Sequence, residues 1–190
     1  MKTLQTSTAR EAGLTIIELV VALVVVGVVI TLAAPSMRGM MARHRVQGVQ
    51  DGLLTDLQLA RSEVAQRSGT LTVVALTFGG NADVSCYTVH VSGADCDCTR
   101  GAGSACTVTP SAEIKTTHLT RAAGVSVAAS SPSGTRIEFE PPRGMVKPAT
   151  AGMVIDVQDA VSGHLRTSIN SLGVPSVCSP DGSMRGVNPC

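Results

Sequence analysis

One nearly uncharged stretch at the start of the chain limits what the rest can be. It runs from Leu14 to Ala34, a length of 21 residues, and Glu18 is the one charged residue in it. At about 1.5 Å per residue, a helix of this length measures roughly 30 Å, the thickness of the hydrocarbon core of a bilayer. The stretch therefore predicts a membrane helix with a single carboxylate in its first turn, where burial in lipid is costly.

Residues 1–13 form a short polar leader before this helix. An ordinary secretory signal has an apolar core of 7–15 residues with a small-residue cleavage site after it. Here the core is longer, and Ala34 is followed directly by Pro35, so we do not expect cleavage at the far end. Cleavage after Gly13 would leave the helix attached. Pro35 has no backbone N–H to donate, which predicts a kink at that point.

A second helical pattern follows the proline. Apolar residues recur at steps of three and four, which is typical of a helix with one apolar face. The residues at these steps are Val46, Val49, Leu53, Leu57, Ala60 and Val64. We therefore expect a membrane or assembly helix over 14–35 and an amphipathic helix over 36–68. Polar residues such as Asp56 and Arg61 are expected off the apolar face.

After Gly69 the pattern changes to short runs rich in Val, Thr and Ile, separated by Gly, Pro and Ser, as in an antiparallel sheet. The expected strands are 70–78, 84–91, 113–119, 125–129, 135–140, 153–158 and 165–170. Segment 92–105 and the tail 173–190 are expected to be irregular. The fold class is α+β, with a long N-terminal helix whose outer half packs on a β-rich domain over 69–190.

Composition argues against several classes of function. The chain has no Trp, one Tyr and two Phe, which disfavours stacking on nucleic-acid bases. Its net charge is +1, and without residues 1–13 it has thirteen basic and thirteen acidic residues, so no general attraction to nucleic acid is expected. The four histidines are scattered, and Glu138 and Glu140 alternate with apolar residues as on one face of a strand. We expect no enzyme activity, no cofactor and no metal.

Six cysteines follow the apolar stretch: Cys86, Cys96, Cys98, Cys106, Cys178 and Cys190. An even number in Gly-rich surroundings indicates disulfides and an oxidising compartment, which places this domain on the outer side of the membrane. We expect Cys178 to pair with Cys190, and Cys96 and Cys98 to take different partners because near neighbours pair only with strain. The alternative is a zinc site at Cys96, Cys98 and Cys106, although the spacing lacks a CxxC pair.

The start of the helix resembles a known pattern. Residues 13–19 read Gly-Leu-Thr-Ile-Ile-Glu-Leu, followed by an apolar helix and Pro35. This is similar to the N-terminus of type IV pilins and pseudopilins, in which the residue after the glycine is usually Phe. Residues 34–37 (Ala-Pro-Ser-Met), the helix around residues 56–64 and the strand after it further resemble the GspH/FimT family. That family contains minor pseudopilins of type II secretion and minor pilins of type IV pili.

The resemblance implies specific roles for four residues. A prepilin peptidase would cut between Gly13 and Leu14 on the cytoplasmic face and methylate the new amine of Leu14. Glu18 would pair with the N-terminal amine of a neighbouring subunit and set the assembly register, and Pro35 would kink the helix. The alternative for Glu18 is that its side chain reaches the membrane interface.

As a whole, the resemblance implies a type IV pilin-like fold and a non-catalytic subunit that primes or caps assembly of a type IV pilus or a type II secretion pseudopilus. Its partners would be other pilins, the peptidase and the inner membrane, with the β-rich domain in the periplasm. A second alternative is a type II secretion protein H that acts in protein export.

DNA uptake or adhesion at a pilus tip is the alternative from the binding class. Some pilus-type members of the family bind DNA through a Gly-Arg-x-Arg element after the last strand. The matching place here is Gly173-Val174-Pro175-Ser176, so both arginines are replaced, by Val174 and Ser176. The flanking Arg166 and Arg185 are isolated, whereas phosphate binding draws on clustered cations. DNA binding is therefore disfavoured, and the basic residues at 38–45 fit lipid headgroups or assembly contacts better.

Overall fold

The computed structural model describes residues 13, 15–67, 72–93, 95–107, 112–130, 134–147 and 152–190. Leader residues 1–12 and Leu14 lie outside these ranges, as do the expected helix stop at Ser68 and Gly69 and the first two residues of the expected strand 70–78. The chain divides into two compact units, Met1–Arg38 and Gly39–Cys190, and each is described by itself.

One helix, α1, covers Ile16–Gln66, so the two expected helices form a single one that continues through position 35. The side chain of Pro35 is outside the described part, and the kink there stays a prediction. In the second unit, the expected apolar stripe is confirmed. Val46, Leu53 and Leu57 are buried, and the same face is continued by the remaining members of the stripe: Val49, Ala60 and Val64.

The position of Asp56 was wrongly predicted. It lies on the buried face of α1 between Leu53 and Ala60, and it is 1% exposed. Helical periodicity alone predicts that a charged residue lies on the polar face. The Asp56 carboxylate is buried instead because side chains of the sheet donate hydrogen bonds to it. A buried charge is tolerated only where such partners exist.

In the part of the chain that the structure describes, nine strands follow the helix, and seven of them match the expected runs. The strands are β1 Val74–Gly80, β2 Val84–Val91, β3 Glu113–Thr120, β4 Val125–Ser130, β5 Arg136–Glu140, β6 Met145–Lys147, β7 Met153–Asp159, β8 His164–Ile169 and β9 Pro175–Cys178. Two short 3-10 helices, η2 Cys98–Arg100 and η3 Arg121–Ala123, lie among them. The α+β, pilin-like fold class is confirmed.

Two of these strands were not expected. β6 has three residues, too few to show alternation, and it pairs only with β5. β9 contradicts the irregular tail predicted for 173–190. Its first residue is Pro175, and it lies at the edge of its sheet next to β8. A proline is compatible with the first position of an edge strand, because no ladder hydrogen bond from its nitrogen is needed there.

The strands form two antiparallel sheets rather than one. The first has the order β3-β2-β1-β5-β6 and the second the order β4-β7-β8-β9. The chain first passes from one sheet to the other, between β3 and β4, through η3 and Gly124, whose φ of 85° lies in the left-handed region. A Cβ at Gly124 would lie 3.1 Å from the Asp159 carboxylate. Glycine therefore allows the tight passage between the sheets.

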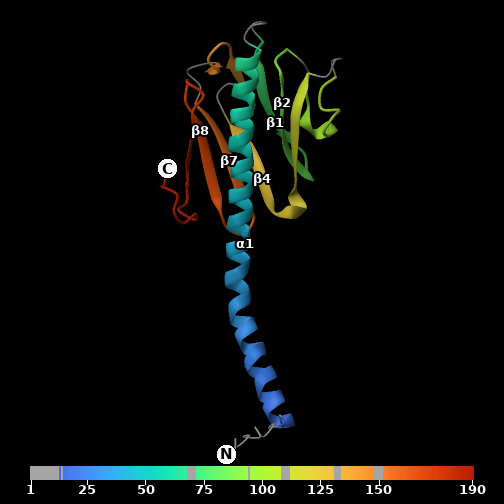
Figure 1. The fold of residues 1–190 in the computed structure, drawn as a ribbon, viewed down its shortest axis with the longest axis vertical. Coiled ribbons are helices and arrows are strands. Elements are labelled where there is room, and N and C mark those ends of the chain that lie inside the picture. Colours follow the sequence, from blue (N-terminus) through green and yellow to red (C-terminus); the bar gives the residue numbers. More distant parts are fainter. Residues whose placement is uncertain are drawn as a thin grey trace, which may run out of the picture. The chain divides into compact units, whose positions relative to one another are not determined.

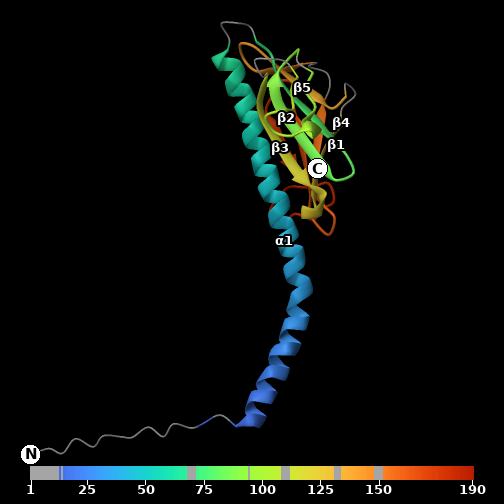
Figure 2. The ribbon, with the colours of Figure 1, turned by 90° about the vertical axis from the view of Figure 1, so that its right-hand side faces the viewer.

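The second half of α1 lies on one side of both sheets (Figures 1 and 2). All three aromatic residues, Phe78, Tyr87 and Phe139, belong to the shared core, together with Leu53 from the helix and Ile155 from β7. The helix also makes a polar contact with each sheet: Gln50 Nε2 donates to Thr167 Oγ1 on β8 at 2.6 Å, and Asp56 binds β2 and β3. The core thus joins α1 to both sheets.

Candidate functional site

The start of α1 is fixed by a side-chain cap. Thr15 Oγ1 accepts a hydrogen bond from the backbone N–H of Glu18 at 3.3 Å, and the Thr15 carbonyl accepts one from Leu19. Thr15 is therefore the N-cap, and Glu18 is the third residue of the helix, as in the Thr-x-x-Glu capping box. Sequence reasoning missed the role of Thr15, although the motif is present in the sequence. The arrangement holds the Glu18 carboxylate at the positive end of the helix dipole.

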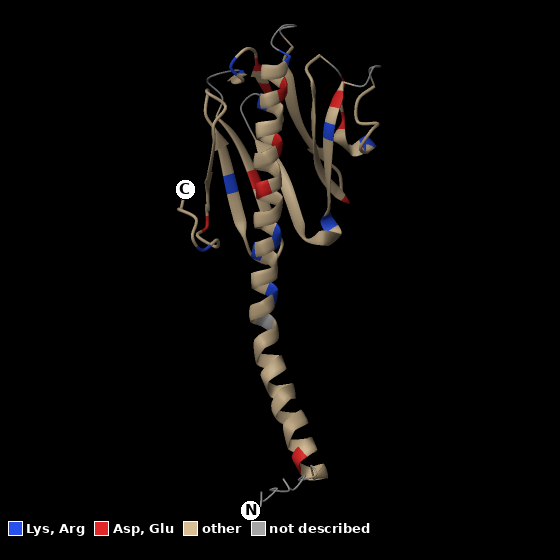
Figure 3. Cartoon of the chain, in the orientation of Figure 1, with Lys and Arg blue, Asp and Glu red and all other residues tan. Residues whose placement is uncertain are grey.

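The apolar half of α1, Ile16–Ala34, is not buried by other described residues of its own unit. Every large apolar side chain from Ile16 to Leu32 is between 52% and 84% exposed. The span Ile16–Ala34 has 19 residues and a mean hydropathy of 3.0, so it is long and apolar enough to cross a membrane. Figure 3 shows a single acidic residue near the start of this half and no other charged residue through most of it. Such a surface requires lipid or other helices as a partner.

The expected roles of the residues around the cut stay predictions. Gly13 is exposed and precedes the helix, while Leu14 lies outside the described residues. Of the basic residues that follow the span, Arg38 ends the first unit, and Arg43 and Arg45 belong to the second. Arg45 is exposed and, within the described ranges, its guanidinium has no hydrogen bond or ion pair, and the Nε of Arg43 is buried without a partner.

A buried polar cluster joins α1 to the first sheet. The Asp56 carboxylate accepts from Tyr87 Oη at 2.8 Å, from Lys115 Nζ at 2.5 Å and from Thr117 Oγ1 at 3.3 Å. Burial raises the pKa of Tyr87 well above its usual value, so its hydroxyl stays a donor. All three donors are used to hold the carboxylate, which indicates a structural role. The cluster was not found from the sequence, because its members are far apart in the chain.

Next to this cluster lies an apolar groove of about 400 Å³. Its walls come from the α1 residues Gly48, Val49 and Gly52, and from Leu119 and Val125 at the junction of β3 and β4. Side chains could be added at both glycines without contact within 4 Å, so the groove is open along the helix.

No catalytic arrangement is found in the part of the chain that the structure describes. Its one pair of a hydroxyl with an imidazole is Thr77 and His90, 2.8 Å apart. His90 is fully buried, and its other ring nitrogen bonds to the Val91 carbonyl. Burial lowers the pKa of His90, which keeps the ring neutral. The pair therefore has no access to a substrate.

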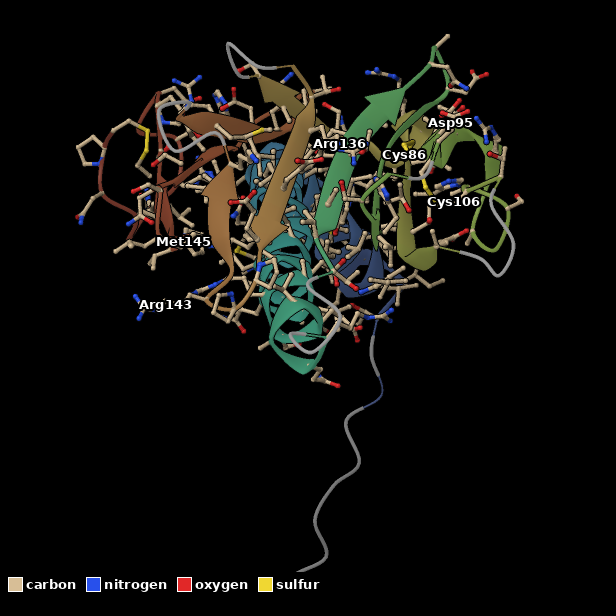
Figure 4. All side chains as sticks on the ribbon, turned by 90° about the horizontal axis from the view of Figure 1, so that it is seen from above. Cys86, Asp95, Cys106, Arg136, Arg143 and Met145 are labelled. Carbon is tan, nitrogen blue, oxygen red and sulfur yellow. A yellow bond between two sulfur atoms is a disulfide. The ribbon has the colours of Figure 1, made fainter. Side chains whose placement is uncertain are left out.

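The six cysteines form three disulfides in the structure: Cys86–Cys98, Cys96–Cys106 and Cys178–Cys190. Cys96 and Cys98 have different partners, as expected. Figure 4 labels Cys86 and Cys106, which appear on the same side of the domain in that view. Ring nitrogen and sulfur atoms of His90, Cys96 and Cys106 lie within 4.8 Å of one another, but both sulfurs are in a disulfide and offer no thiolate to a metal. The three cysteines of the alternative zinc site, Cys96, Cys98 and Cys106, are all in disulfides in this structure.

The place that corresponds to the DNA-binding element is the connection between β8 and β9. Val174 there is 46% exposed and Leu172 is 60% exposed, and the polar Asn170 and Ser171 are exposed beside them. Arg166 is paired with Asp156, with Nε and Oδ1 2.8 Å apart. Burial raises the pKa of Asp156, but hydrogen bonds from Arg166 and His164 outweigh it and hold that pKa below its usual value. Arg61 of α1 also reaches this place: its Nε would lie 3.4 Å from a Cβ added at Gly173, and it has no hydrogen-bond partner among the described residues.

The comparisons with known proteins agree with the fold. A sequence profile of the family described as type II transport protein GspH matches residues 50–173, which is more than half of the chain. The match covers α1 from Gln50 onwards and strands β1 to β8. Comparison with curated proteins and with solved structures found no match. The helix, the two sheets and the profile lead to one conclusion: the chain belongs to the GspH family of type II transport proteins.

Proposed function

We propose that the chain is a minor pilin or pseudopilin, a structural subunit that primes or caps assembly of a type II secretion pseudopilus or a type IV pilus. The observation that carries this proposal is the apolar half of α1, which is exposed throughout and has one carboxylate at its capped start. A helix of this kind serves two environments in turn: the inner membrane before assembly, and the helices of neighbouring subunits afterwards.

The proposed processing follows from the residues before the helix. A prepilin peptidase cuts between Gly13 and Leu14 and methylates the new amine of Leu14. Because α1 begins at Ile16, the cut lies outside the helix. The β-rich domain then faces the periplasm, where its disulfides are stable.

Glu18 sets the register of assembly in this proposal. An uncompensated carboxylate in a membrane helix costs about 2.5–3.5 kcal/mol on insertion scales. The Leu14 amine of a neighbouring subunit compensates that charge only when the two helices are aligned at one height. The charge pair therefore selects the alignment, while the apolar side chains supply contact area.

Mass spectrometry of the membrane-extracted protein tests the processing. The expected mature N-terminus is N-methylated Leu14, and any other mature N-terminus contradicts the pilin proposal. Assembly is tested separately with Glu18→Gln, which keeps the side-chain shape and removes the charge. We expect that variant to enter the membrane normally but to be lost from sheared filaments, whereas the control Glu63→Gln, near the other end of α1, assembles as the unmodified protein does.

Membership of a family described as type II transport proteins favours the secretion pseudopilus over the pilus. DNA reception at a pilus tip has less support, because Val174 and Ser176 stand where the DNA-binding element has its two arginines. A gel-shift assay with the whole detergent-solubilised chain distinguishes a DNA receptor from a purely structural subunit. Tight, salt-sensitive DNA binding would favour the receptor, since phosphate contacts release counterions.

A further inference from the structure

The turn between β7 and β8, residues 160–163, presents an apolar residue at its tip. Val161 is 75% exposed, the highest value among the large apolar side chains described in the unit Gly39–Cys190. Turns at the surface normally carry Gly, Asn, Asp or Ser. Asp159 Oδ1 accepts the backbone N–H groups of Val161 and Ser162, and Asp159 N–H donates to the Gly163 carbonyl at 3.0 Å. The tip is thus held outward by its own hydrogen bonds.

The same turn is attached to the beginning of α1 in this unit. Ser162 Oγ donates to the Gly39 carbonyl at 3.3 Å. Gly163 lies against the helix so closely that a Cβ there would be 3.5 Å from the Arg43 Cα. Val161 is therefore held beside the Gly39–Arg43 part of the helix, where Met40 and Met41 are 54% and 50% exposed.

This end of the domain also carries cations without acidic partners. The Arg45 guanidinium is unpaired within the described residues. Arg121 lines a hollow of about 270 Å³ between η3 and the turn, together with Asp159 and Ala160. One Asp159 oxygen is already used by the turn amides. Exposed apolar side chains beside arginines are the combination found where proteins meet a membrane surface.

Covalent geometry keeps this end near the apolar span. Gly39 follows Ala34, the last residue of the span, by five residues. Whatever path the chain takes, five residues reach at most about 18 Å. The headgroup layer on each side of the hydrocarbon core is roughly 5–8 Å thick. Gly39 therefore lies within about 18 Å of the end of the span, a distance from which side chains of the domain can reach the headgroup layer.

We propose that the turn 160–163 is a second membrane contact, in which Val161, Met40 and Met41 enter the interfacial layer of the bilayer while Arg45 and Arg121 bind lipid phosphates. This inference rests on the proposed function, because it needs Ile16–Ala34 to span the membrane. The contact holds the subunit at a fixed height in the membrane before assembly, and it must release when the subunit enters a filament.

The natural chain contains no tryptophan, so a single introduced one reports its own surroundings. Three full-length variants are reconstituted singly into phospholipid nanodiscs: Val161→Trp, Leu172→Trp and Val25→Trp. Leu172 is the matched control, since it is also exposed but lies beyond the other end of β8. Emission maxima, quenching by shallowly brominated lipids and quenching by acrylamide are measured. Discs of phosphatidylcholine are compared with discs that also contain phosphatidylglycerol.

We expect V161W to emit at shorter wavelength than L172W, to be quenched by the brominated lipid and to be protected from acrylamide, more so with phosphatidylglycerol present. If V25W is quenched by lipid while V161W behaves like L172W, the second contact is wrong and the span stands. If V25W is not quenched by lipid, the span itself fails. If V161W becomes shielded only when a second chain is added, its occupant is another subunit and the membrane assignment is overturned.

Discussion

The phenol hydroxyl of Tyr87 donates a 2.8 Å hydrogen bond to the buried carboxylate of Asp56, and this bond joins α1 to β2. The same carboxylate holds Lys115 and Thr117 of β3. Because Tyr87 is the one tyrosine and the chain has no tryptophan, its fluorescence reports on this contact directly.

Asp56→Ala leaves the Tyr87 hydroxyl buried without an acceptor. We expect a loss of about 2–3 kcal/mol in the free energy of unfolding, since an unpaired buried donor retains its full desolvation penalty. Tyr87→Phe removes only the donor and is expected to cost about 1 kcal/mol. Urea unfolding followed by circular dichroism measures both. The control is Glu63→Gln, which removes an exposed helix ion pair with Arg67 and should change stability by under about 0.5 kcal/mol.

Gly173 tests how closely the two sheets approach each other. Its φ is 74°, and an added Cβ would lie 2.6 Å from the Gly144 carbonyl oxygen. Gly182 has a similar φ of 65°, but an added Cβ there meets no atom within 4 Å. Gly182→Ala should cost about 1–2 kcal/mol from backbone strain alone. We expect Gly173→Ala to cost clearly more in urea unfolding, and equal costs would contradict the close approach.

The disulfides Cys86–Cys98 and Cys178–Cys190 offer a matched comparison, because each closes a separation of 12 residues. Chain entropy alone predicts a similar loss for each, about 3 kcal/mol. Cys86 and Cys98 are also buried in the protein, whereas Cys190 is exposed. The double variant C86A/C98A should therefore be less stable than C178A/C190A. Under limiting reductant, alkylation and mass spectrometry should detect Cys178 and Cys190 first.

Acid should destabilise the domain through His90. Burial lowers its pKa in the folded protein, while in the unfolded chain the ring titrates near about 6.5. Below that pH the unfolded state binds the extra proton, so the free energy of unfolding falls as the pH decreases towards the folded pKa. His90→Gln should remove this part of the pH dependence. Urea unfolding of both proteins across this range measures the difference, and parallel curves would show that His90 does not contribute.

Periodicity predicted the elements of this fold better than their arrangement. The stripe from Val46 to Val64 identified the buried face of α1, and alternation identified β5, where Ile137 and Phe139 point inward. The division into two sheets could not be predicted from the sequence. The residues around Gly124, where the chain first changes sheet, look in sequence like an ordinary turn between two strands. Asp56 was misplaced for a related reason. A one-dimensional pattern cannot show that Tyr87 and Lys115 will supply its donors.

The candidate site divides in the same way. The Gly-Leu-Thr-x-x-Glu motif and the apolar stretch were readable because their residues are consecutive, and even the cap by Thr15 was present in the sequence as Thr-x-x-Glu. The groove beside Gly48 and the turn that carries Val161 were not readable, because each arises where distant segments meet.

The contacts of α1 with the two sheets have a mechanical consequence for a subunit held by its helix. Gln50 binds Thr167 on one sheet, and Asp56 binds Tyr87 on the other, within two turns of the same helix. A pull along the helix axis acts on both contacts in shear and at the same time. The load is therefore shared between the two sheets, and neither sheet separates from the helix before the other is also under force.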